Sequence, residues 1–122
     1  MKVLFLSTGS GETEKYAESL TSCIPCEVTW LRYDTDHITE ESLYAQTRDA
    51  KPDFIVYIGS RWGRNPAIAT LARINEQVAP MVHLCSDAAD LPWHDLLRDY
   101  DRAGAFTLQV AIDGNPRWPG AE

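Results

Sequence analysis

The sequence has few residues that could form disulfide bonds and no long apolar run near its start that could anchor it in a membrane. It has three cysteines in 122 residues, an odd number that is too small for a disulfide framework. The longest apolar run near its start, Val3 to Leu6, is far too short for a signal peptide or a membrane-spanning helix. We therefore expect a cytoplasmic protein with no membrane insertion.

Basic residues are also scarce. There are 11 lysines and arginines against 18 aspartates and glutamates, which gives a net charge of −7. A surface this acidic repels phosphate backbones, so we expect no nucleic-acid partner. The hydrophobic share of 44% and the chain length are those of one ordinary globular domain.

Short apolar runs alternate with amphipathic stretches along the whole chain. The runs predict five strands, over 2–7, 27–33, 54–58, 81–85 and 106–113. The stretches predict four helices. The first covers 12–22, and the second runs from a Thr39 cap to Pro52. The third has an Asn65 cap, Pro66 at its first helical position and its end at Pro80, and the fourth runs from an Asp90 cap to Gly104. This alternation predicts a single three-layer α/β/α domain with a mainly parallel sheet.

The apolar patterns of the strands favour one strand order. The strands over 54–58 and, less cleanly, 81–85 are continuous apolar runs, as is Val3 to Leu6, so we expect them to be covered on both faces. The strands over 27–33 and 106–113 are mixed or alternating, which is typical of sheet edges. We therefore favour the flavodoxin-like order 2-1-3-4-5 over the Rossmann order 3-2-1-4-5.

The end of the chain lacks an element that the favoured order normally has. A fifth helix normally returns after the last strand and shares one sheet face with the first helix. We assign 1–114 to the Rossmann-like α/β domain and 115–122 to a tail, which contains two prolines and is too short for that helix. Half of one sheet face would then be bare, so we expect either a missing C-terminal domain or a homodimer partner to cover it.

In open parallel sheets, ligands bind beyond the carboxyl ends of the strands. The loop after the first strand has two glycines that permit a tight turn, hydroxyl groups, and free amides at a helix start, which together predict an anion-binding cradle. It matches neither nucleotide-binding fingerprint, Glu12 places a negative charge there, and the alternative is a plain strand-to-helix turn. The candidate substrate-binding residues of this loop are Thr8, Gly9, Ser10, Gly11 and Thr13.

Two further loops at the same sheet edge carry candidate residues. Trp62 lies between two arginines and would stack on a ring or sugar, with packing against a helix as the alternative. Asp87 ends the fourth strand and would act as a general base, with helix capping as the alternative. The remaining candidate contacts in these loops are Ser60, Gly63 and Ser86.

The cysteines and histidines give little support for a metal or redox site. Cys23 and Cys26 have the C-x-x-C spacing, but they close a helix, whereas a redox pair should open one. Zinc would need two more ligands of suitable spacing. His83 and Cys85 share one face of a strand, and two residues alone are weak evidence for a metal. We assign no metal site.

Three blocks covering about half of the chain resemble the N-terminal half of bacterial two-domain glycosyltransferases of the GT-B type. They are DFIVYIG at 53–59, APMVHLCSDAADLPW at 79–93 and GAFTLQVAIDG at 104–114. The resemblance implies a Rossmann-like domain that holds a sugar or glycan acceptor, with the nucleotide-sugar site on a second domain and no obligatory metal or cofactor. The chain would then be inactive alone, with Glu12 or Asp87 as catalytic base and Trp62 as sugar platform.

A second resemblance is to flavodoxin. Thr8–Glu14 resembles its phosphate loop, and Gly59–Gly63 resembles the loop whose aromatic residue stacks on the flavin. This resemblance implies FMN as cofactor, with Ser10, Gly11 and Thr13 on its phosphate and Trp62 over its ring. The third loop lacks the usual tyrosine, and the closing helix is absent. A non-catalytic, self-associating α/β domain is the third hypothesis.

Overall fold

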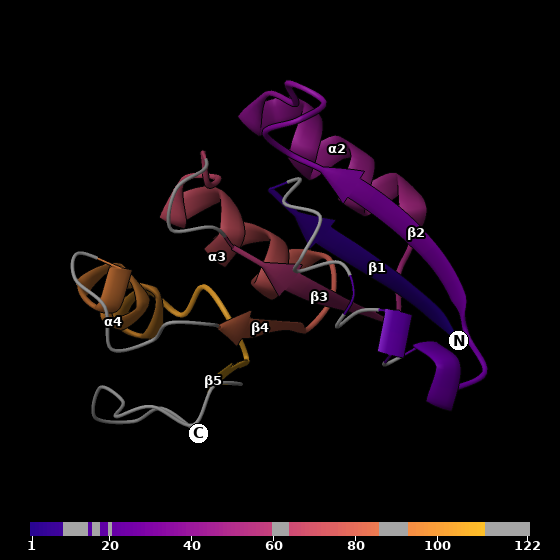
Figure 1. Cartoon of the computed structure of the whole chain (residues 1–122). Coiled ribbons are helices and arrows are strands. Elements are labelled where there is room, and N and C mark those ends of the chain that lie inside the picture. Colours follow the sequence, from indigo (N-terminus) through magenta and orange to yellow (C-terminus); the bar gives the residue numbers. More distant parts are fainter. Residues whose placement is uncertain (9–14, 16–17, 20, 60–63, 86–92, 112–122) are drawn as a thin grey trace.

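The computed structural model describes residues 1–8, 15, 18–19, 21–59, 64–85 and 93–111. They contain one sheet of five strands in the order β2-β1-β3-β4-β5, and all neighbouring strands are parallel (Figure 1). This order confirms the predicted 2-1-3-4-5 topology. The strands are β1 (Lys2–Ser7), β2 (Glu27–Arg32), β3 (Phe54–Ile58), β4 (Met81–Cys85) and β5 (Leu108–Ala111).

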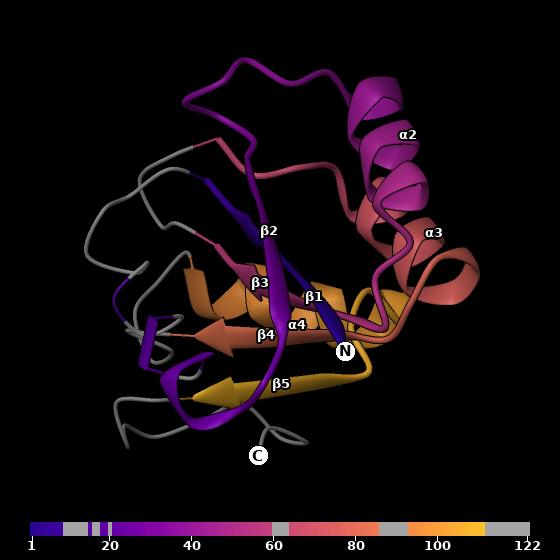
Figure 2. The same ribbon diagram turned by 90° about the vertical axis from the view of Figure 1, so that its right-hand side faces the viewer.

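Three helices pack on one face of the sheet through a shared core: α2 (Glu40–Ala50), α3 (Ile68–Gln77) and α4 (Trp93–Ala103). Figure 2 shows α2 and α3 together on one side of the strands. Residues 15, 18–19 and 21–23 are also helical, as the predicted helix over 12–22 requires, and the rest of that helix lies outside the described residues. None of the helices described has the length and apolar character needed to cross a bilayer.

Local capping signals fix the start of α2 and the end of α4. The Thr39 hydroxyl accepts a hydrogen bond from the Ser42 amide at 3.2 Å, which confirms it as the predicted cap of α2. Glu40 and Glu41 follow in the first turn, where their charges suit the helix dipole. Gly104, with φ of +67°, adopts the left-handed conformation that ends α4.

The predicted start of α3 is wrong by two residues, since the cap is Ala67 instead of Asn65. The helix begins at Ile68 after Ala67, which has no side chain able to cap it. The Asn65 side chain, predicted as the cap, instead accepts a hydrogen bond from the Tyr57 hydroxyl at 2.7 Å. The Ala67 amide donates to the Glu40 carboxylate at 3.0 Å. Contacts from β3 and α2 therefore replace the local cap that the sequence suggests.

The core is divided between the two faces of the sheet. The larger cluster lies under α2, α3 and α4, and includes fully buried Leu4, Ile55 and Met81 from the strands. A smaller cluster on the opposite face is built from the other side of β1 and β3. There Phe5 stacks on Trp30 with ring centroids 4.9 Å apart. Both faces of β1 and β3 are therefore buried, as their continuous apolar runs predict, whereas one face of β4 is only half-buried, contrary to the prediction for 81–85.

Strand β5 is shorter than predicted, and its polar side faces the core. Its described part is Leu108–Ala111 rather than 106–113, because Phe106 precedes it and 112–113 lie outside the described residues. Gln109 is 3% exposed on the face covered by α4, whereas Leu108 is 40% exposed on the other face. Gln109 accepts a hydrogen bond from His83 of β4 and donates two to α4, which makes this inward orientation possible.

Candidate functional site

The strand order places a topological switch point between β1 and β3. The chain leaves β1 towards β2 on one side and leaves β3 towards β4 on the other. Ser7 pairs in register with Ile58, so the loops that follow β1 and β3 start side by side. Ligands of open α/β sheets bind at such a point. The loops after β1 and β3, two of the three loops predicted to carry site residues, begin at this point, and their role as a site stays a prediction.

Thr8 is the one predicted site residue within the described chain. It is 4% exposed, and its carbonyl accepts hydrogen bonds from the Thr35 amide at 3.3 Å and from the Thr35 hydroxyl at 3.4 Å. Thr8 therefore ties the end of β1 to the segment after β2. The other predicted residues lie outside the described residues, so their roles stay predictions: Gly9, Ser10, Gly11, Glu12, Thr13, Ser60, Trp62, Gly63, Ser86 and Asp87.

Arg64 organises the described part of the rim beside this switch point. Its guanidinium donates to the Tyr33 hydroxyl at 3.1 Å and to the Ile38 carbonyl at 3.0 Å, and lies 4.2 Å from the centroid of the Tyr33 ring. Its backbone amide donates to the Asp34 carboxylate at 3.2 Å. Arg64 thus fastens the segment before α3 to the segment after β2. The sequence marks Arg64 only as a charge near the site and does not reveal these contacts.

The charges of this rim are fixed around neutral pH. Burial and the hydrogen bond to Glu40 raise the pKa of Tyr33 to about 12, so its phenol stays neutral. Burial opposes ionisation of Glu40, but hydrogen bonds from Thr70, Tyr33 and Ala67 outweigh it and lower the pKa of the Glu40 carboxyl. Glu40 is therefore a structural anion that holds α2 and α3 together, rather than a proton donor.

Aromatic packing fills the space where β3 ends towards β4. A Cβ atom on Gly59 would lie 2.9 Å from the Trp93 ring and 3.0 Å from the Tyr57 ring. It would also lie 3.1 Å from the Asn65 side-chain oxygen. Glycine is required at position 59 because the Trp93 ring occupies the space that a side chain at this position would need. Trp93 and Tyr57 thus fill the space beside Gly59, while the predicted site residues after β4 lie outside the described residues.

No group of three or more His, Cys, Asp or Glu side chains is arranged for a metal ion within the described segments. His83 and Cys85 do meet on the buried face, with the Cys85 sulfur 3.3 Å from His83 Nδ1. That nitrogen is already 2.7 Å from the Gln109 side-chain oxygen. Cys23 is exposed and Cys26 is half-buried, and both are free thiols.

Comparison with known proteins finds similarity in structure only. No protein-family model matches the chain, and no curated protein sequence matches it. The signal receiver domain of a modulated diguanylate cyclase from Desulfovibrio desulfuricans G20 is 17% identical, with a TM-score of 0.64 over 92% of this chain and 81% of that one. A structure named as a pilus assembly protein, CpaE, from Burkholderia thailandensis E264 is 15% identical, with a TM-score of 0.62 over 92% of this chain and 85% of that one.

The capsular polysaccharide assembling protein CapF from Staphylococcus aureus is a further match. It is 19% identical, with a TM-score of 0.52, and the match covers 98% of this chain but 34% of that one. At these identities the likeness concerns the fold. The chain is a single α/β domain of the flavodoxin-like and receiver-like type, with a five-stranded parallel sheet.

We predict that Gly59→Ala destabilises the protein by about 1–3 kcal/mol, because the added methyl group overpacks a filled space. The free energy of unfolding from chemical denaturation measures this cost. Trp93→Phe removes the ring atom that would lie 2.9 Å from the new methyl group, so Gly59→Ala should cost less in that background. An equal cost in both backgrounds would show that Trp93 does not restrict this position.

Proposed function

We propose that this chain is a non-catalytic association domain that pairs with a second copy of itself through an apolar strip on its sheet. The strip consists of Val82 and Leu84 of β4 with Leu108 and Val110 of β5. The observation that carries the proposal is the exposure of Leu108, which is 40%. A large aliphatic side chain in a strand is normally buried against a second layer.

The register of the strands makes these four residues one surface. Val82 pairs with Leu108 and Leu84 pairs with Val110, so all four point to the face opposite α4. Val82, Leu84 and Val110 are half-buried. The apolar strip is therefore one patch across two neighbouring strands rather than scattered residues.

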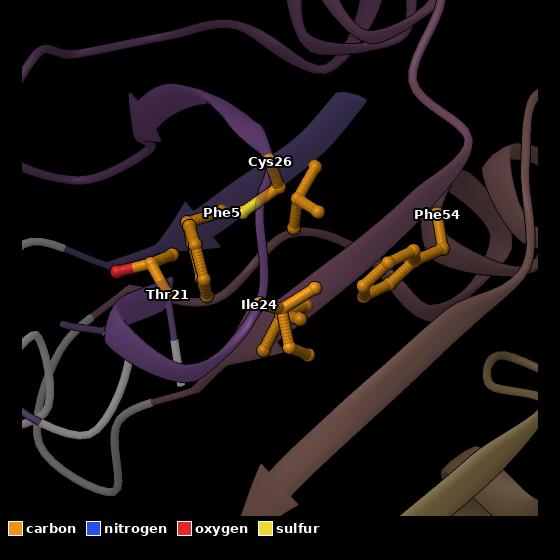
Figure 3. Close-up of a pocket in the computed structure, with 7 residues that line it drawn as sticks. Phe5, Thr21, Ile24, Cys26 and Phe54 are labelled. Atoms are coloured by element: carbon orange, nitrogen blue, oxygen red, sulfur yellow. The ribbon is translucent and has the colours of Figure 1, made fainter. Parts of the chain in front are cut away.

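The apolar surface continues towards β1. Figure 3 shows a pocket between the turn at Ile24 and the strands, with Phe54 at its side. Ile24 is 40% exposed at this pocket. Described helical residues reach this face beside β1 and β3, where Thr21 lines the pocket with Phe5 and Val56. The sequence predicts that half of this face is bare, and the exposure of Leu108 on β5 supports that expectation.

A second copy suits the strip because the strip has no charged residue. Two identical apolar patches can face each other about a two-fold axis without charge complementarity, while the net charge of −7 is carried elsewhere. The names of two proteins of similar fold refer to assembly, namely of pili and of capsular polysaccharide. These names support an association role only by analogy of fold. The comparisons lend no support to the glycosyltransferase hypothesis.

We expect Leu108→Glu to weaken self-association at least about tenfold, because each pair would bury two Leu108 side chains more fully. Sedimentation velocity over a concentration series measures the dissociation constant. Ala69→Glu is the matched control, since it adds the same charge at an exposed position in the first turn of α3, across the sheet.

Wild-type protein that sediments as a monomer at every concentration would contradict the pairing. So would equal association of the Leu108→Glu and Ala69→Glu variants. If the protein is a monomer, a further domain of a longer protein would replace the second copy as the expected partner of the apolar strip.

FMN binding at the β1–β3 switch point is a second candidate function. It is favoured by the burial of Ser7 and Thr8 at the end of β1, next to the loop that follows β3. In this hypothesis Ser10, Gly11 and Thr13 hold the phosphate and Trp62 covers the ring. A sugar acceptor at the same position is the corresponding proposal of the glycosyltransferase hypothesis, with Asp87 or Glu12 as base.

On the FMN hypothesis, titration with the purified protein should quench flavin fluorescence. Riboflavin lacks the phosphate and is the matched control, so it should bind at least about tenfold more weakly, because charge-assisted hydrogen bonds to the phosphate are lost. Unchanged flavin fluorescence on addition of excess protein would exclude this function.

A further inference from the structure

A polar cluster is buried beneath α4, in a region that neither proposed function uses. His83 of β4 is 0% exposed and Gln109 of β5 is 3% exposed, and they are paired in register. Figure 1 shows α4 beside β4, at the opposite end of the helix layer from α2. The cluster therefore lies between one helix and the two last strands of the sheet.

Hydrogen bonds fix the orientation of the Gln109 amide and, through it, the tautomer of His83. The Gln109 nitrogen donates to the Leu97 carbonyl and to the Asp101 carboxylate, both at 2.8 Å. These partners only accept, so the Gln109 oxygen is the atom 2.7 Å from His83 Nδ1. Because an amide oxygen also only accepts, Nδ1 must carry the hydrogen of the neutral ring.

The other ring nitrogen of His83 is buried without a hydrogen-bond partner in the described structure. The ring centroid of Phe106 lies 4.7 Å from that of His83, and the centroid of Tyr57 lies 4.9 Å away. Trp93 and Tyr100 approach edge-on, each at 5.8 Å. A proton added at Nε2 would therefore create a buried cation with a donor that meets aromatic rings instead of an acceptor.

All three buried residues of α4 contact this cluster. They are Trp93, Leu97 and Tyr100. Trp93 and Tyr100 pack their rings on His83, and the Leu97 carbonyl accepts from Gln109. Asp101 adds a second hydrogen bond from the same helix. The attachment of α4 to the sheet thus passes through His83 and Gln109.

We propose that His83 and Gln109 form an acid-sensitive anchor for α4, and that protonation of His83 releases α4 from β4 and β5 while α2 stays in place. Release opens the aromatic surroundings to water and lets the imidazolium be solvated. The anchor is a conformational device of the domain and does not depend on the proposed association.

The two tyrosines that face His83 stay neutral between about pH 7.5 and pH 5.5, the range in which the response is expected. Burial raises the pKa of Tyr57 of β3 well above its usual value and raises the pKa of Tyr100 of α4 to about 12. Cys85 of β4 is the remaining buried titratable neighbour, and Asp101 of α4 is a carboxylate on the outer side of Gln109. Trp93, Phe106 and Gln109 do not titrate.

The direction of the response follows from the burial of His83. Burial lowers its pKa to about 4, although the hydrogen bond to Gln109 acts in the opposite direction. Once α4 is released, His83 on β4 is exposed to water and its pKa returns to about 6.5. The anchor is therefore at full strength above about pH 6.5 and weakens as the pH falls towards 4.

Amide hydrogen exchange on the full chain tests the proposal by comparing 93–103 with 40–50. From about pH 7.5 to about pH 5.5, the opening equilibrium of α4, corrected for intrinsic exchange, should rise about tenfold, and that of α2 should stay constant. His83→Gln keeps a donor towards Gln109 but cannot titrate, so it should abolish the pH dependence. His37→Asn is the matched control, because His37 is exposed and asparagine tolerates its φ of +52°.

The proposal would be overturned if the opening equilibrium of α4 were the same at the lower pH. It would also be overturned if the opening equilibria of α2 and α4 rose equally. The same response in His83→Gln as in wild type would also overturn it. The comparison of α4 with α2 uses the wild-type chain, so the test stands even where His83→Gln fails to fold.

Discussion

A parallel sheet exposes two apolar faces, and every part of this structure depends on how those faces are covered. Three helices pack on one face, where strand residues such as Leu4 and Ile55 are fully buried. The opposite face is covered over β1 and β3, where Phe5 and Val56 form a second cluster. On β5, by contrast, Leu108 of this face is exposed. We infer the association role from this imbalance between the two faces.

Strand β5 connects the two inferences that go beyond the fold. Consecutive residues of a strand point to opposite faces, so Leu108 points outward and Gln109 points towards α4. The outward residue belongs to the apolar strip, and the inward residue holds the helix. A change on one side of β5 therefore acts on a strand of four residues that also serves the other side. The inward position is buried and is occupied by a polar residue. Gln109 is stable there because its side-chain oxygen accepts one hydrogen bond and its nitrogen donates two.

The sequence predicts the strand order well because a strand that is buried on both faces has a continuous run of apolar residues. Continuous apolar runs mark β1 and β3 as central, and the caps Thr39 and Gly104 give element ends through local chemistry. The start of α3 escapes prediction because Glu40, far away in the chain, supplies the bond that Asn65 was expected to make. Tertiary contacts of this kind leave no local signal.

The candidate site is predictable in its position but not in its contacts. Strand order alone places the loops after β1 and β3 side by side, and Thr8 lies there as expected. Alternation in β5 separates two sets of residues, but it cannot say that Gln109 rather than Leu108 faces the helices. Arg64 likewise has partners, Tyr33 and Asp34, that become neighbours only when the segments after β2 and β3 meet. Such pairs depend on the fold and cannot be inferred from spacing.

The most direct test of the pairing is an intermolecular methyl NOE measurement on a mixture of isotope-labelled and unlabelled protein. If a second copy covers the apolar strip, methyl groups of Leu84, Leu108 and Val110 in the labelled copy should give NOEs to the same residues of the unlabelled copy. NOEs from Leu108 only to residues of its own chain would contradict it, because the strip would then already be covered from within.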